Sequence, residues 1–243
     1  MTFTREQARR LERAISLSGI SPGEPHPCPY LPGRQSRNLT LVPSPLAPGV
    51  YEMLMQLNFR RMGPFFYRPE CGTCRECRAV RVFVEGFRPN RSQRRCRARN
   101  LDLVVSAGPP RPTPAKHALY RRYLEARHDG LMSGSEGEFE AFLYRSPLST
   151  IEMEYRAQGR LIGVGIADLE PRSMSAVYCY FEPDAAARAP GVFNVLWMLD
   201  ECRRRSLSHL YLGYFVRGSA KMSYKGGFKP RELLGTDGEW RPL

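Results

Sequence analysis

The stretch IEMEYRAQGRLIGVGIADLEPRSMSAVYCYFE, residues 151–182, decides the fold of this chain. It contains three runs rich in β-branched, aromatic and aliphatic residues, at Ile151 to Ala157, Arg160 to Leu169 and Met174 to Glu182. The pair Gln158-Gly159 separates the first two runs, and a short turn that begins at Glu170 separates the second from the third. Connections this short join antiparallel neighbours, so the stretch predicts a three-stranded antiparallel meander.

The segments on either side of the meander extend it to a mixed domain. Before it, helices are predicted from Ala115 to His128 and from Glu136 to Tyr144. After it come a helix from Gly191 to Arg205 and a strand from His209 to Val216. The order of meander, helix and strand resembles the acetyltransferase-like (GNAT) fold. We therefore expect an α+β protein whose second half has this fold with a mostly antiparallel sheet.

The residues before position 108 predict a smaller N-terminal domain. A capping box at Thr4 to Gln7 predicts a helix that ends before Gly19. A second helix is expected from Pro48 or Gly49 to about Arg61, and strands at Leu39 to Val42, Phe65 to Tyr67 and Ala79 to Glu85. The proline-rich run 108–114 is the predicted boundary. We divide the chain into an N-terminal domain (1–107), a linker (108–114) and a GNAT-like domain (115–243).

Composition and charge narrow the class of protein. The chain has 243 residues, 42% of them hydrophobic, and 37 Lys and Arg against 24 Asp and Glu give a formal net charge of +13. This charge favours a polyanionic partner such as nucleic acid. No window of about 18 consecutive apolar residues occurs, which argues against a membrane-spanning helix. The N-terminus lacks the order of a secretory signal and the seven cysteines are an odd number, so we expect a cytoplasmic protein.

The positive charge concentrates between Arg75 and Arg99, where nine arginines stand against two glutamates. Ser92 is the predicted cap of a helix that carries several of these arginines.

Three cysteines, Cys71, Cys74 and Cys77, recur at every third position in the turn between two predicted strands. Three thiols this close can share one soft metal ion, and the distal Cys28 could supply the fourth ligand of a zinc site or an iron–sulfur cluster. No second pair with this spacing completes the set, so a structural or redox-sensitive role for the thiols stays open.

Several catalytic motifs are absent from the sequence, among them the nucleophile elbow, the Walker loop, the dinucleotide fingerprint and the zinc-protease HExxH. The four histidines are scattered, and structural or surface roles are expected for His26, His117, His128 and His209. Arg188 to Gly191 stands where the GNAT fold binds the pyrophosphate of coenzyme A, but Phe193 departs from that signature.

A dozen ordered matches resemble a known family. They include Cys28-Pro-Tyr-Leu, Phe59-Arg-Arg-Met-Gly, Tyr67-Arg-Pro, Cys74-x-x-Cys77-Arg78-x-x-Arg81, Ser92-Gln-Arg-Arg95, Arg99-Asn100 and Tyr211-Leu-Gly-Tyr214 followed by Lys221-Met-x-Tyr-Lys225. From about Pro27 to Trp240 the chain resembles the bacterial aspartate/glutamate leucyltransferases, relatives of the eukaryotic arginyl-tRNA–protein transferases. The N-terminal helix lies outside the resemblance.

The resemblance implies an enzyme that moves leucine from Leu-tRNA to the N-terminal amine of proteins beginning with Asp or Glu, which creates a degradation signal (an N-degron). An aminoacyl ester is already activated, so the implied reaction requires no cofactor and no ATP site. It requires that amine and ester be placed together, that the ammonium lose a proton and that an oxyanion be stabilised. The implied partners are Leu-tRNA and acidic protein N-termini, and neither DNA nor a membrane.

The resemblance also suggests roles for individual residues. Arg78 and Arg81 are predicted to hold the acceptor carboxylate as a cationic fork, with a solvated strand face as the alternative. Glu182 and Asp184 match the family's acidic region after the third strand, where Glu182 replaces the usual Asp. They are predicted to orient the acceptor ammonium or the terminal adenosine, with a capping or loop role as the alternative.

The cations near the C-terminus are assigned to the reacting end of the tRNA. Lys221 is predicted to contact the tRNA terminus, and Tyr224 and Lys225 the ester oxygen, with a solvated loop as the alternative. Phe65 to Tyr67 or Leu161 to Ile166 could line the leucine pocket. The arginines predicted to contact tRNA phosphates, unless they form a merely solvated helix face, are Arg91, Arg94, Arg95, Arg97 and Arg99.

Two other functions stay open on the sequence. One is a CoA-dependent acetyltransferase, which protection by acetyl-CoA against heating would favour. The other is a non-enzymatic, metal-stabilised nucleic-acid-binding module, which RNA binding without leucine transfer would favour. The residues do not specify the donor amino acid independently of the resemblance.

Overall fold

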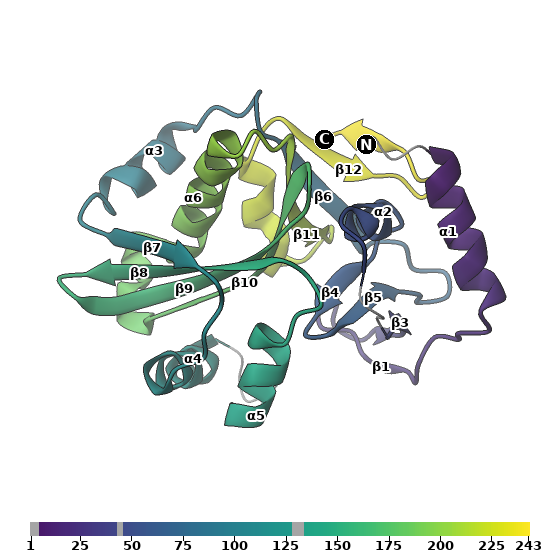
Figure 1. Cartoon of the computed structure of the whole chain (residues 1–243), viewed down its shortest axis with the longest axis horizontal. Coiled ribbons are helices and arrows are strands. Elements are labelled where there is room, and N and C mark those ends of the chain that lie inside the picture. Colours follow the sequence, from purple (N-terminus) through teal and green to yellow (C-terminus); the bar gives the residue numbers. More distant parts are fainter. Residues whose placement is uncertain (1–4, 43–45, 128–133) are drawn as a thin grey trace.

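The computed structural model describes residues 5–42, 46–127 and 134–243 (Figure 1). Its helices are α1 (Arg5–Leu17), α2 (Val50–Gln56), α3 (Arg91–Ala98), α4 (Pro114–Arg127), α5 (Glu136–Phe139) and α6 (Pro190–Arg204). A π-helical turn, η1 (Glu140–Tyr144), continues α5, and 3₁₀ turns form η2 (Pro183–Arg188) and η3 (Ala220–Gly227).

The strands are β1 (His26–Pro27), β2 (Gln35–Ser36), β3 (Asn38–Leu41), β4 (Arg60–Met62), β5 (Phe65–Pro69), β6 (Arg78–Phe83), β7 (Val104–Gly108), β8 (Thr150–Ala157), β9 (Arg160–Leu169), β10 (Ser173–Phe181), β11 (His209–Phe215), β12 (Arg231–Leu234) and β13 (Trp240–Pro242).

The predicted antiparallel meander is confirmed by the pairing of β8, β9 and β10. β9 lies in the middle and pairs antiparallel with both neighbours. Gln158 and Gly159 form the first hairpin turn, with φ angles of 49° and 80°. Two consecutive left-handed residues match the right-handed twist of the flanking strands, which is why this pair makes a two-residue turn.

The meander belongs to an eight-stranded sheet with the order β13-β12-β6-β11-β10-β9-β8-β7. Only β10 and β11 run parallel in it, so the expectation of an α+β fold with a mostly antiparallel sheet is confirmed. β6 and β7 come from before the predicted linker 108–114, and Gly108 is the last residue of β7. The large sheet thus contains strands from both sides of that boundary, and the division into 1–107 and 115–243 stays a prediction.

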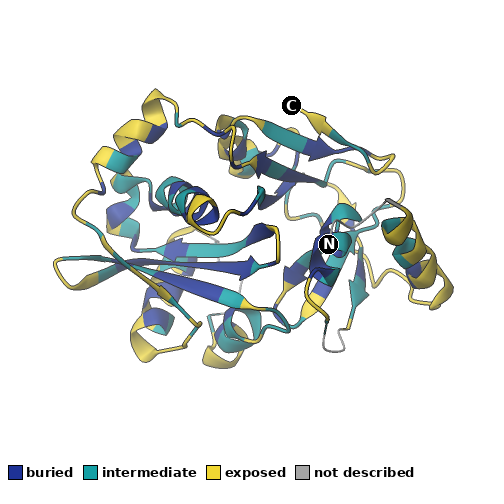
Figure 2. Ribbon diagram, turned by 45° about the horizontal axis from the view of Figure 1, so that its top comes forward, coloured by how far each residue is buried: buried dark blue, intermediate teal, exposed yellow. Residues whose placement is uncertain are grey.

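Helices cover both faces of the large sheet. α3 and α6 lie on one face and α4 and α5 on the other (Figure 1). Met153 of β8 and Leu196 of α6 belong to the core on the first face. Leu119 of α4 and Val164 of β9 belong to the core on the second. Figure 2 shows buried residues (dark blue) along the strands and on the helix sides that face them.

A small sheet with the order β3-β5-β4 stands beside the large one and carries α1 and α2 (Figure 1). Its core contains Tyr51 and Phe66 and also Tyr211 of β11, so one hydrophobic cluster joins the two sheets. Arg61 of β4 and Asp168 of β9 add a fully buried ion pair, with 2.8 Å between Nε and Oδ2. The small sheet is therefore fixed to the large one by apolar packing and by a buried charge pair.

One predicted helix is too long, because the helix expected to reach about Arg61 ends at Gln56. Asn58 turns the chain with a φ of 66°, in the left-handed region that asparagine tolerates. Its side chain donates to the carbonyl of Cys77 and accepts from the amide of Ala79, each at 2.8 Å. These bonds tie the turn to a distant strand, so helical periodicity alone overestimates the helix.

The predicted cap of α3 is wrong by two residues. Asn90, rather than Ser92, accepts from the amide of Gln93, and the Gln93 side chain accepts from the amide of Asn90, each at 2.9 Å. This reciprocal pair is a capping box, and it lets α3 begin at Arg91. The cap expected at Thr4 lies outside the described residues.

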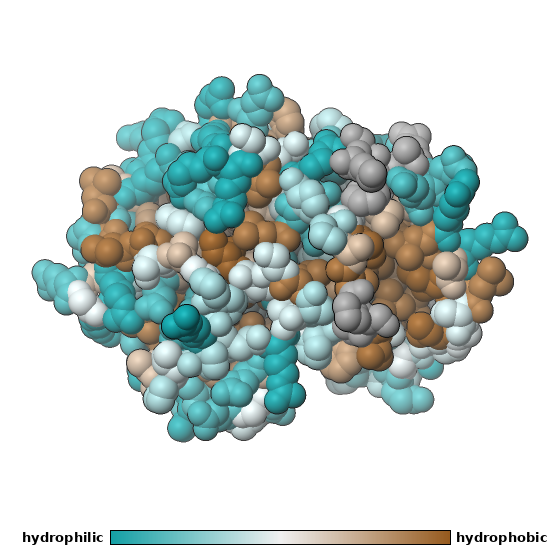
Figure 3. Space-filling view, in the orientation of Figure 1, coloured by the Kyte–Doolittle hydropathy of each residue, from teal (hydrophilic) through white to brown (hydrophobic). Residues whose placement is uncertain are grey.

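The surface carries both apolar and hydrophilic side chains. Figure 3 shows apolar side chains (brown) gathered in a band across the middle of one face and hydrophilic ones (teal) above and below it. Leu101, which precedes β7, is 83% exposed, and Val104, the first residue of β7, is 70% exposed. Across residues 5–42, 46–127 and 134–243, the structure has no helix with the length and hydrophobicity needed to cross a bilayer.

Candidate active site

The two parallel strands of the large sheet part soon after they meet. β10 and β11 pair only from Ser173 opposite His209 to Ser175 opposite Tyr211. Beyond Ser175, the described residues of the two strands form no further pair. Each strand is also irregular just past this point, because the register of β10 against β9 shifts between Ala176 and Tyr178 and Gly213 of β11 has a φ of 78°. We call this opening the strand parting.

The side chain of Arg60, from β4, lies at the strand parting. Its Nη2 donates to the carbonyl of Ala176 on β10 at 2.7 Å, and its guanidinium lies 5.7 Å from the ring centroid of Tyr214 on β11. A Cβ at Gly213 would lie 1.3 Å from Nη1 of Arg60, so only glycine leaves room for this cation. The Nε of Arg60 is buried and has no hydrogen-bond partner among the described residues.

Tyrosines rather than acids surround Arg60. Burial raises the pKa values of the Tyr30, Tyr67 and Tyr214 hydroxyls, and it raises the pKa of Tyr51 to about 12. These phenols are therefore neutral at physiological pH. No Asp or Glu of the described residues forms an ion pair with Arg60. Asp168 lies within reach of its charge, but Arg61 already pairs with that carboxylate.

The side chain of Lys225, from η3, also lies at the strand parting. Its side chain is buried, and Nζ donates to the carbonyl of Tyr214 at 2.6 Å. Burial, followed by the charge of Arg60, lowers the pKa of Lys225 well below 10.5. The neighbouring Tyr224 is 45% exposed, and its ring centroid lies 6.0 Å from Nζ of Lys225. The structure thus brings two predicted residues, Tyr224 and Lys225, together with Arg60.

Arg60 itself is absent from the residues predicted to act at the site. Its strand was predicted as part of a helix, so its side chain had no expected direction. The available signal was the motif Phe59-Arg-Arg-Met-Gly, which belongs to the family resemblance.

The two predicted acids lie at the end of β10, where neighbouring arginines neutralise them. Glu182 is buried and accepts from Nη2 and Nε of Arg122 on α4 at 2.6 and 3.1 Å. Asp184 is exposed and accepts from Arg160 at 2.8 Å. Among the described residues, no hydrogen bond or ion pair joins either carboxylate to Arg60 or Lys225, and each is engaged by a guanidinium.

Arg78 and Arg81 do not form the expected fork. They are three residues apart on β6, and side chains at odd spacing leave opposite faces of a strand. Nε of Arg78 donates to the carbonyl of Leu234 at 2.7 Å. Arg81 pairs with Glu232 at 2.8 Å and lies 4.1 Å from the ring centroid of Trp240. One carboxylate cannot be held by both.

The arginines expected to contact tRNA form an exposed surface on α3 and at its end. Arg91, Arg94, Arg95 and Arg99 are exposed, whereas Arg97 donates twice to Asp200 of α6, at 2.8 and 2.9 Å. Arg94 also donates to the carbonyl of Pro89 at 2.7 Å. The exposed Lys221 stands apart from this surface, in η3 beside Tyr224.

The four thiols of Cys28, Cys71, Cys74 and Cys77 are neighbours. Burial raises the pKa of Cys77 to about 12, and the charges of the other three add to the effect. Cys74 accepts from Arg34 at 3.5 Å, and Cys71 donates to the carbonyl of Arg37 at 3.8 Å. Within residues 5–42, 46–127 and 134–243, no group of three or more Cys, His, Asp or Glu is arranged to hold a metal ion. As they stand, the thiols do not fit a zinc or iron–sulfur site.

The histidines lie apart from the strand parting. His117 contacts the carbonyl of Gly134 at 2.7 Å, and His26 is exposed. Burial lowers the pKa of His209 to about 4, and its Nε2 lies 3.9 Å from a Glu232 oxygen. His128 lies outside the described residues.

Two family models match separate parts of the chain. A model of the family described as "Arginine-tRNA-protein transferase, N terminus" matches residues 26–95, and one described as "Arginine-tRNA-protein transferase, C terminus" matches residues 115–235. The chain is 43% identical over 214 residues to the "Aspartate/glutamate leucyltransferase" of Pseudomonas putida, covering 87% of this chain and 91% of the relative. It is 41% identical over 221 residues to the protein of that name from Halorhodospira halophila, covering 89% and 93%.

Solved structures with similar folds are far more distant in sequence. FemX shares 8% identity, with a TM-score of 0.46 over 76% of this chain and 65% of that one. The C-terminal domain of a putative lysylphosphatidylglycerol synthetase from Agrobacterium fabrum shares 11% identity, with a TM-score of 0.43 over 70% and 53%.

Proposed function

The chain belongs to the arginine-tRNA–protein transferase family, and on that premise we propose that it moves leucine from Leu-tRNA to the N-terminal amine of proteins that begin with Asp or Glu. The names of the P. putida and H. halophila relatives support this donor and these acceptors. The observation that carries the chemistry is the meeting of Arg60 and Lys225 at the strand parting, where no acid of the described residues pairs with either side chain. Such a pair can take a developing negative charge.

We propose that the leucyl ester enters the strand parting and that Lys225 takes a proton from the acceptor ammonium. The freed amine nitrogen attacks the ester carbonyl and forms the new C–N bond. The guanidinium of Arg60, with its unpartnered Nε, stabilises the oxyanion. The nitrogen of the tetrahedral intermediate loses its second proton to water. When the C–O bond breaks, the proton on Lys225 passes to the departing 3′-oxygen of the terminal adenosine, so Lys225 returns to its neutral form and a neutral amide remains.

The positive charge at the strand parting favours leucine over arginine as the amino acid transferred from the tRNA. An arginine side chain would need an acid nearby, and no acid of the described residues pairs with Arg60 or Lys225. The positive charge of Arg60 would repel a second guanidinium, whereas an aliphatic side chain brings no charge to the site. The rings of Tyr30, Tyr51 and Tyr67 surround Arg60, and we propose that the leucine side chain packs against them.

The same proposal identifies the substrates and the cellular compartment. Leu-tRNA and proteins with acidic N-termini are the substrates, and a new N-terminal leucine would act as a degradation signal. The ester is already activated, so the proposed reaction consumes no ATP and requires no cofactor. All seven cysteines are free thiols, which suits the reducing cytoplasm, where charged tRNA is found.

Glu182 is expected to position the end of β10 rather than to act as the base, because Arg122 occupies both of its oxygens. We predict that Glu182→Gln lowers the single-turnover rate of leucine transfer by less than about tenfold, below the 10²–10⁴-fold typical of general bases. Asp184→Asn serves as the matched variant two residues away. A loss of several hundredfold in Glu182→Gln alone, with unchanged melting temperature, would return the base role to Glu182.

The exposed arginines of α3 are expected to follow the tRNA phosphates. In Arg91→Gln and Arg95→Gln, the slope of log affinity for Leu-tRNA against log salt should become shallower by about 0.9 for each lost contact. Arg97→Gln is the comparison, since Asp200 already neutralises Arg97. Fluorescence anisotropy over a salt series measures the slope. Slopes unchanged in both exposed variants would remove α3 from the tRNA interface.

One assay tests the proposed function as a whole. The protein is incubated with Leu-tRNA or Arg-tRNA and with peptides that begin with Asp, Glu, Lys or Ala, and the products are identified by mass. Leucine on the Asp and Glu peptides alone is the expected result. Arginine transfer, transfer to the Lys or Ala peptide, or acetylation when acetyl-CoA is added would each overturn a stated part of the proposal.

A further inference from the structure

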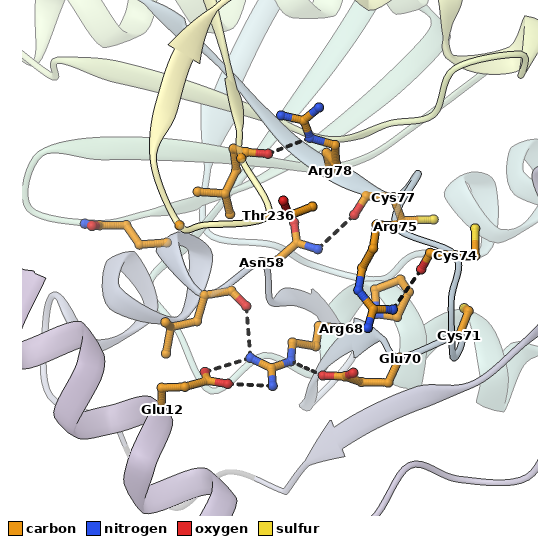
Figure 4. Close-up of a pocket in the computed structure, with 16 residues that line it drawn as sticks. Glu12, Asn58, Arg68, Glu70, Cys71, Cys74, Arg75, Cys77, Arg78 and Thr236 are labelled. Atoms are coloured by element: carbon orange, nitrogen blue, oxygen red, sulfur yellow. Dashed lines mark hydrogen bonds and ion pairs between the residues drawn. The ribbon is translucent and has the colours of Figure 1, made fainter.

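A cavity of about 350 Å³ lies beside the cysteine turn (Figure 4). Its walls come from α1, the end of α2, β5, the cysteine turn and the loop between β12 and β13. Its volume falls within the range of about 300–1,000 Å³ typical of small-ligand sites. Arg78, which also lines it, lies opposite Phe215 at the end of β11. The cavity therefore opens at the end of the sheet towards which β10 and β11 part.

A single tyrosine connects this cavity to the strand parting. The hydroxyl of Tyr214 donates to the carbonyl of Asn58, a residue of the cavity wall, at 2.9 Å. The carbonyl of the same tyrosine accepts from Lys225 at 2.6 Å. Only the side chain of Tyr214 thus separates the cavity wall at Asn58 from the backbone that Lys225 contacts, so a residue bound in the cavity would lie close to the proposed reaction centre.

Arg68, from β5, holds a carboxylate in this cavity. Its Nη1 and Nη2 donate to the two oxygens of Glu12 at 2.7 and 2.8 Å, and its Nε donates to Glu70 at 2.8 Å (Figure 4). The guanidinium also lies 4.8 Å from the ring centroid of Phe59. Two parallel bonds from one guanidinium are the arrangement with which arginine recognises an acidic side chain. The fork is fixed by Glu70 and Phe59 whether or not Glu12 is bound.

Glu12 comes from α1, which precedes the residues 26–95 matched by the N-terminal family model. The Glu12 side chain is 36% exposed and that of Arg68 only 15%. Ile15 and Leu11 anchor α1 in the core of the small sheet. The Glu12 carboxylate can therefore turn into solvent while α1 stays in place, and the fork can be vacated without unfolding.

We propose that this cavity binds the acidic first residue of the acceptor protein, with Arg68 as the carboxylate fork, and that Glu12 occupies the fork until an acceptor displaces it. The inference rests on the proposed function for the identity of the acceptor. It replaces the joint fork expected of Arg78 and Arg81, whose side chains leave opposite faces of β6.

The charge of the cavity supports this assignment. Arg68, Arg75 and Arg78 line it against Glu12 and Glu70. When Glu12 leaves, the excess of positive charge grows, and an incoming aspartate or glutamate side chain restores the balance. A first residue without a carboxylate would leave the fork unpaired in a partly buried place, and a lysine would be repelled.

Peptide binding tests the proposal without any tRNA. Labelled peptides that differ only in a first residue of Asp, Glu or Ala are titrated with the full chain, and fluorescence anisotropy gives their dissociation constants. In Arg68→Gln the Asp and Glu peptides should bind about thirtyfold more weakly or worse, and in Arg68→Lys, which keeps the charge but not the fork, the loss should be smaller. In Glu12→Gln the same peptides should bind about two- to fivefold more tightly, because the competing carboxylate is gone.

Two matched variants control for charge and stability. Glu6→Gln removes an acid of α1 that pairs with Arg10 on the exposed side of the helix. Arg156→Gln removes an arginine that binds Glu154 on β8. Both should bind the peptides as the wild-type chain does. Equal binding of the Asp and Ala peptides by the wild-type chain, unchanged Asp binding in Arg68→Lys and Arg68→Gln, or weaker binding in Glu12→Gln would each overturn the proposal.

The result can be separated from the fate of the proposed function. If leucine is transferred to the Asp peptide but the affinity of the protein for this peptide is the same in the Arg68 variants, the cavity is not the acceptor site and the proposed function stands. If the affinity depends on Arg68 but leucine is not transferred, the site stands and the proposed donor is wrong.

Discussion

Lys225→Met is expected to lower the single-turnover rate of leucine transfer by at least about 100-fold, the low end of what a general base contributes. Lys225 is the one amine that the structure places at the strand parting within the described residues, with Nζ bonded to Tyr214 and beside the Arg60 charge. Methionine has a similar length but can neither accept a proton from the acceptor nor return it to the leaving oxygen. Rapid quench of enzyme loaded with Leu-tRNA and an Asp peptide measures the step.

Folding and binding serve as controls for this variant. The side chain of Lys225 is buried and donates to the Tyr214 carbonyl, so Lys225→Met should cost only the loss of this one hydrogen bond, about 1–3 kcal/mol, and the protein should stay folded at the assay temperature. Affinity for Leu-tRNA should stay within about twofold, because Lys225 is not among the exposed cations expected to bind phosphates. A variant that folds, binds Leu-tRNA and transfers leucine at the wild-type rate would exclude Lys225 from the chemistry.

The pH profile gives a second readout of the same group. Burial lowers the pKa of Lys225, and the positive charge of Arg60 lowers it further. The neutral amine needed by a base therefore persists well below pH 10.5, and the rate should fall only where Lys225 becomes protonated. Removing the Arg60 charge raises the pKa of Lys225, so Arg60→Met should move this acidic limb to higher pH.

Asp168→Asn is expected to destabilise the protein by about 3–5 kcal/mol, because it leaves the buried Arg61 charge without its partner. Arg61 and Asp168 have no exposed side-chain surface, and Thr150 donates to the second Asp168 oxygen at 2.8 Å. Their bond joins the small sheet to β9 of the large one. At about 2–4 °C per kcal/mol for a chain of this size, the melting temperature should fall by roughly 6–20 °C.

Asp184→Asn is the control for that change. Asp184 also pairs with an arginine, Arg160, but its side chain is 63% exposed. An exposed pair of this kind contributes about 0–1 kcal/mol, so the control should melt within a few degrees of the wild-type chain. Equal shifts in the two variants would show that the buried pair does not hold the sheets together.

The meander could be predicted because its signals are local. Alternation, β-branched residues and the pair Gln158-Gly159 all act over a few positions, and β8, β9 and β10 begin and end within about one residue of the predicted strands. The helix predicted to reach Arg61 failed for the opposite reason. Asn58 turns the chain through bonds to Cys77 and Ala79, which no local window contains.

The candidate site was only partly within reach of the sequence. Tyr224 and Lys225 follow from the motif at 221–225, but the place of Arg60 depends on the missing side chain of Gly213, far along the chain. The separation of Arg78 and Arg81, by contrast, was available. Arg81 lies in the strand predicted from Ala79 to Glu85 and Arg78 directly precedes it, and a spacing of three residues along an extended chain puts the two side chains on opposite faces.

The cavity beside the cysteine turn lay beyond sequence reasoning altogether. Glu12 and Arg68 belong to segments with no common motif, and α1 lies outside the family resemblance. Their contact arises only because α1 and β5 pack into the same small core.

The place of the leucyl group can be tested directly by photocrosslinking. Leu-tRNA is replaced by tRNA charged with a diazirine analogue of leucine, bound to the protein, irradiated and digested, and the attached peptides are identified by mass. Crosslinks to β10, β11 or η3, the elements that border Arg60 and Lys225, are the predicted result. A crosslink to Tyr67 of β5, one of the tyrosines around Arg60, would agree with this result. Crosslinks confined to the cysteine turn, or to α3, would contradict an ester bound at the strand parting.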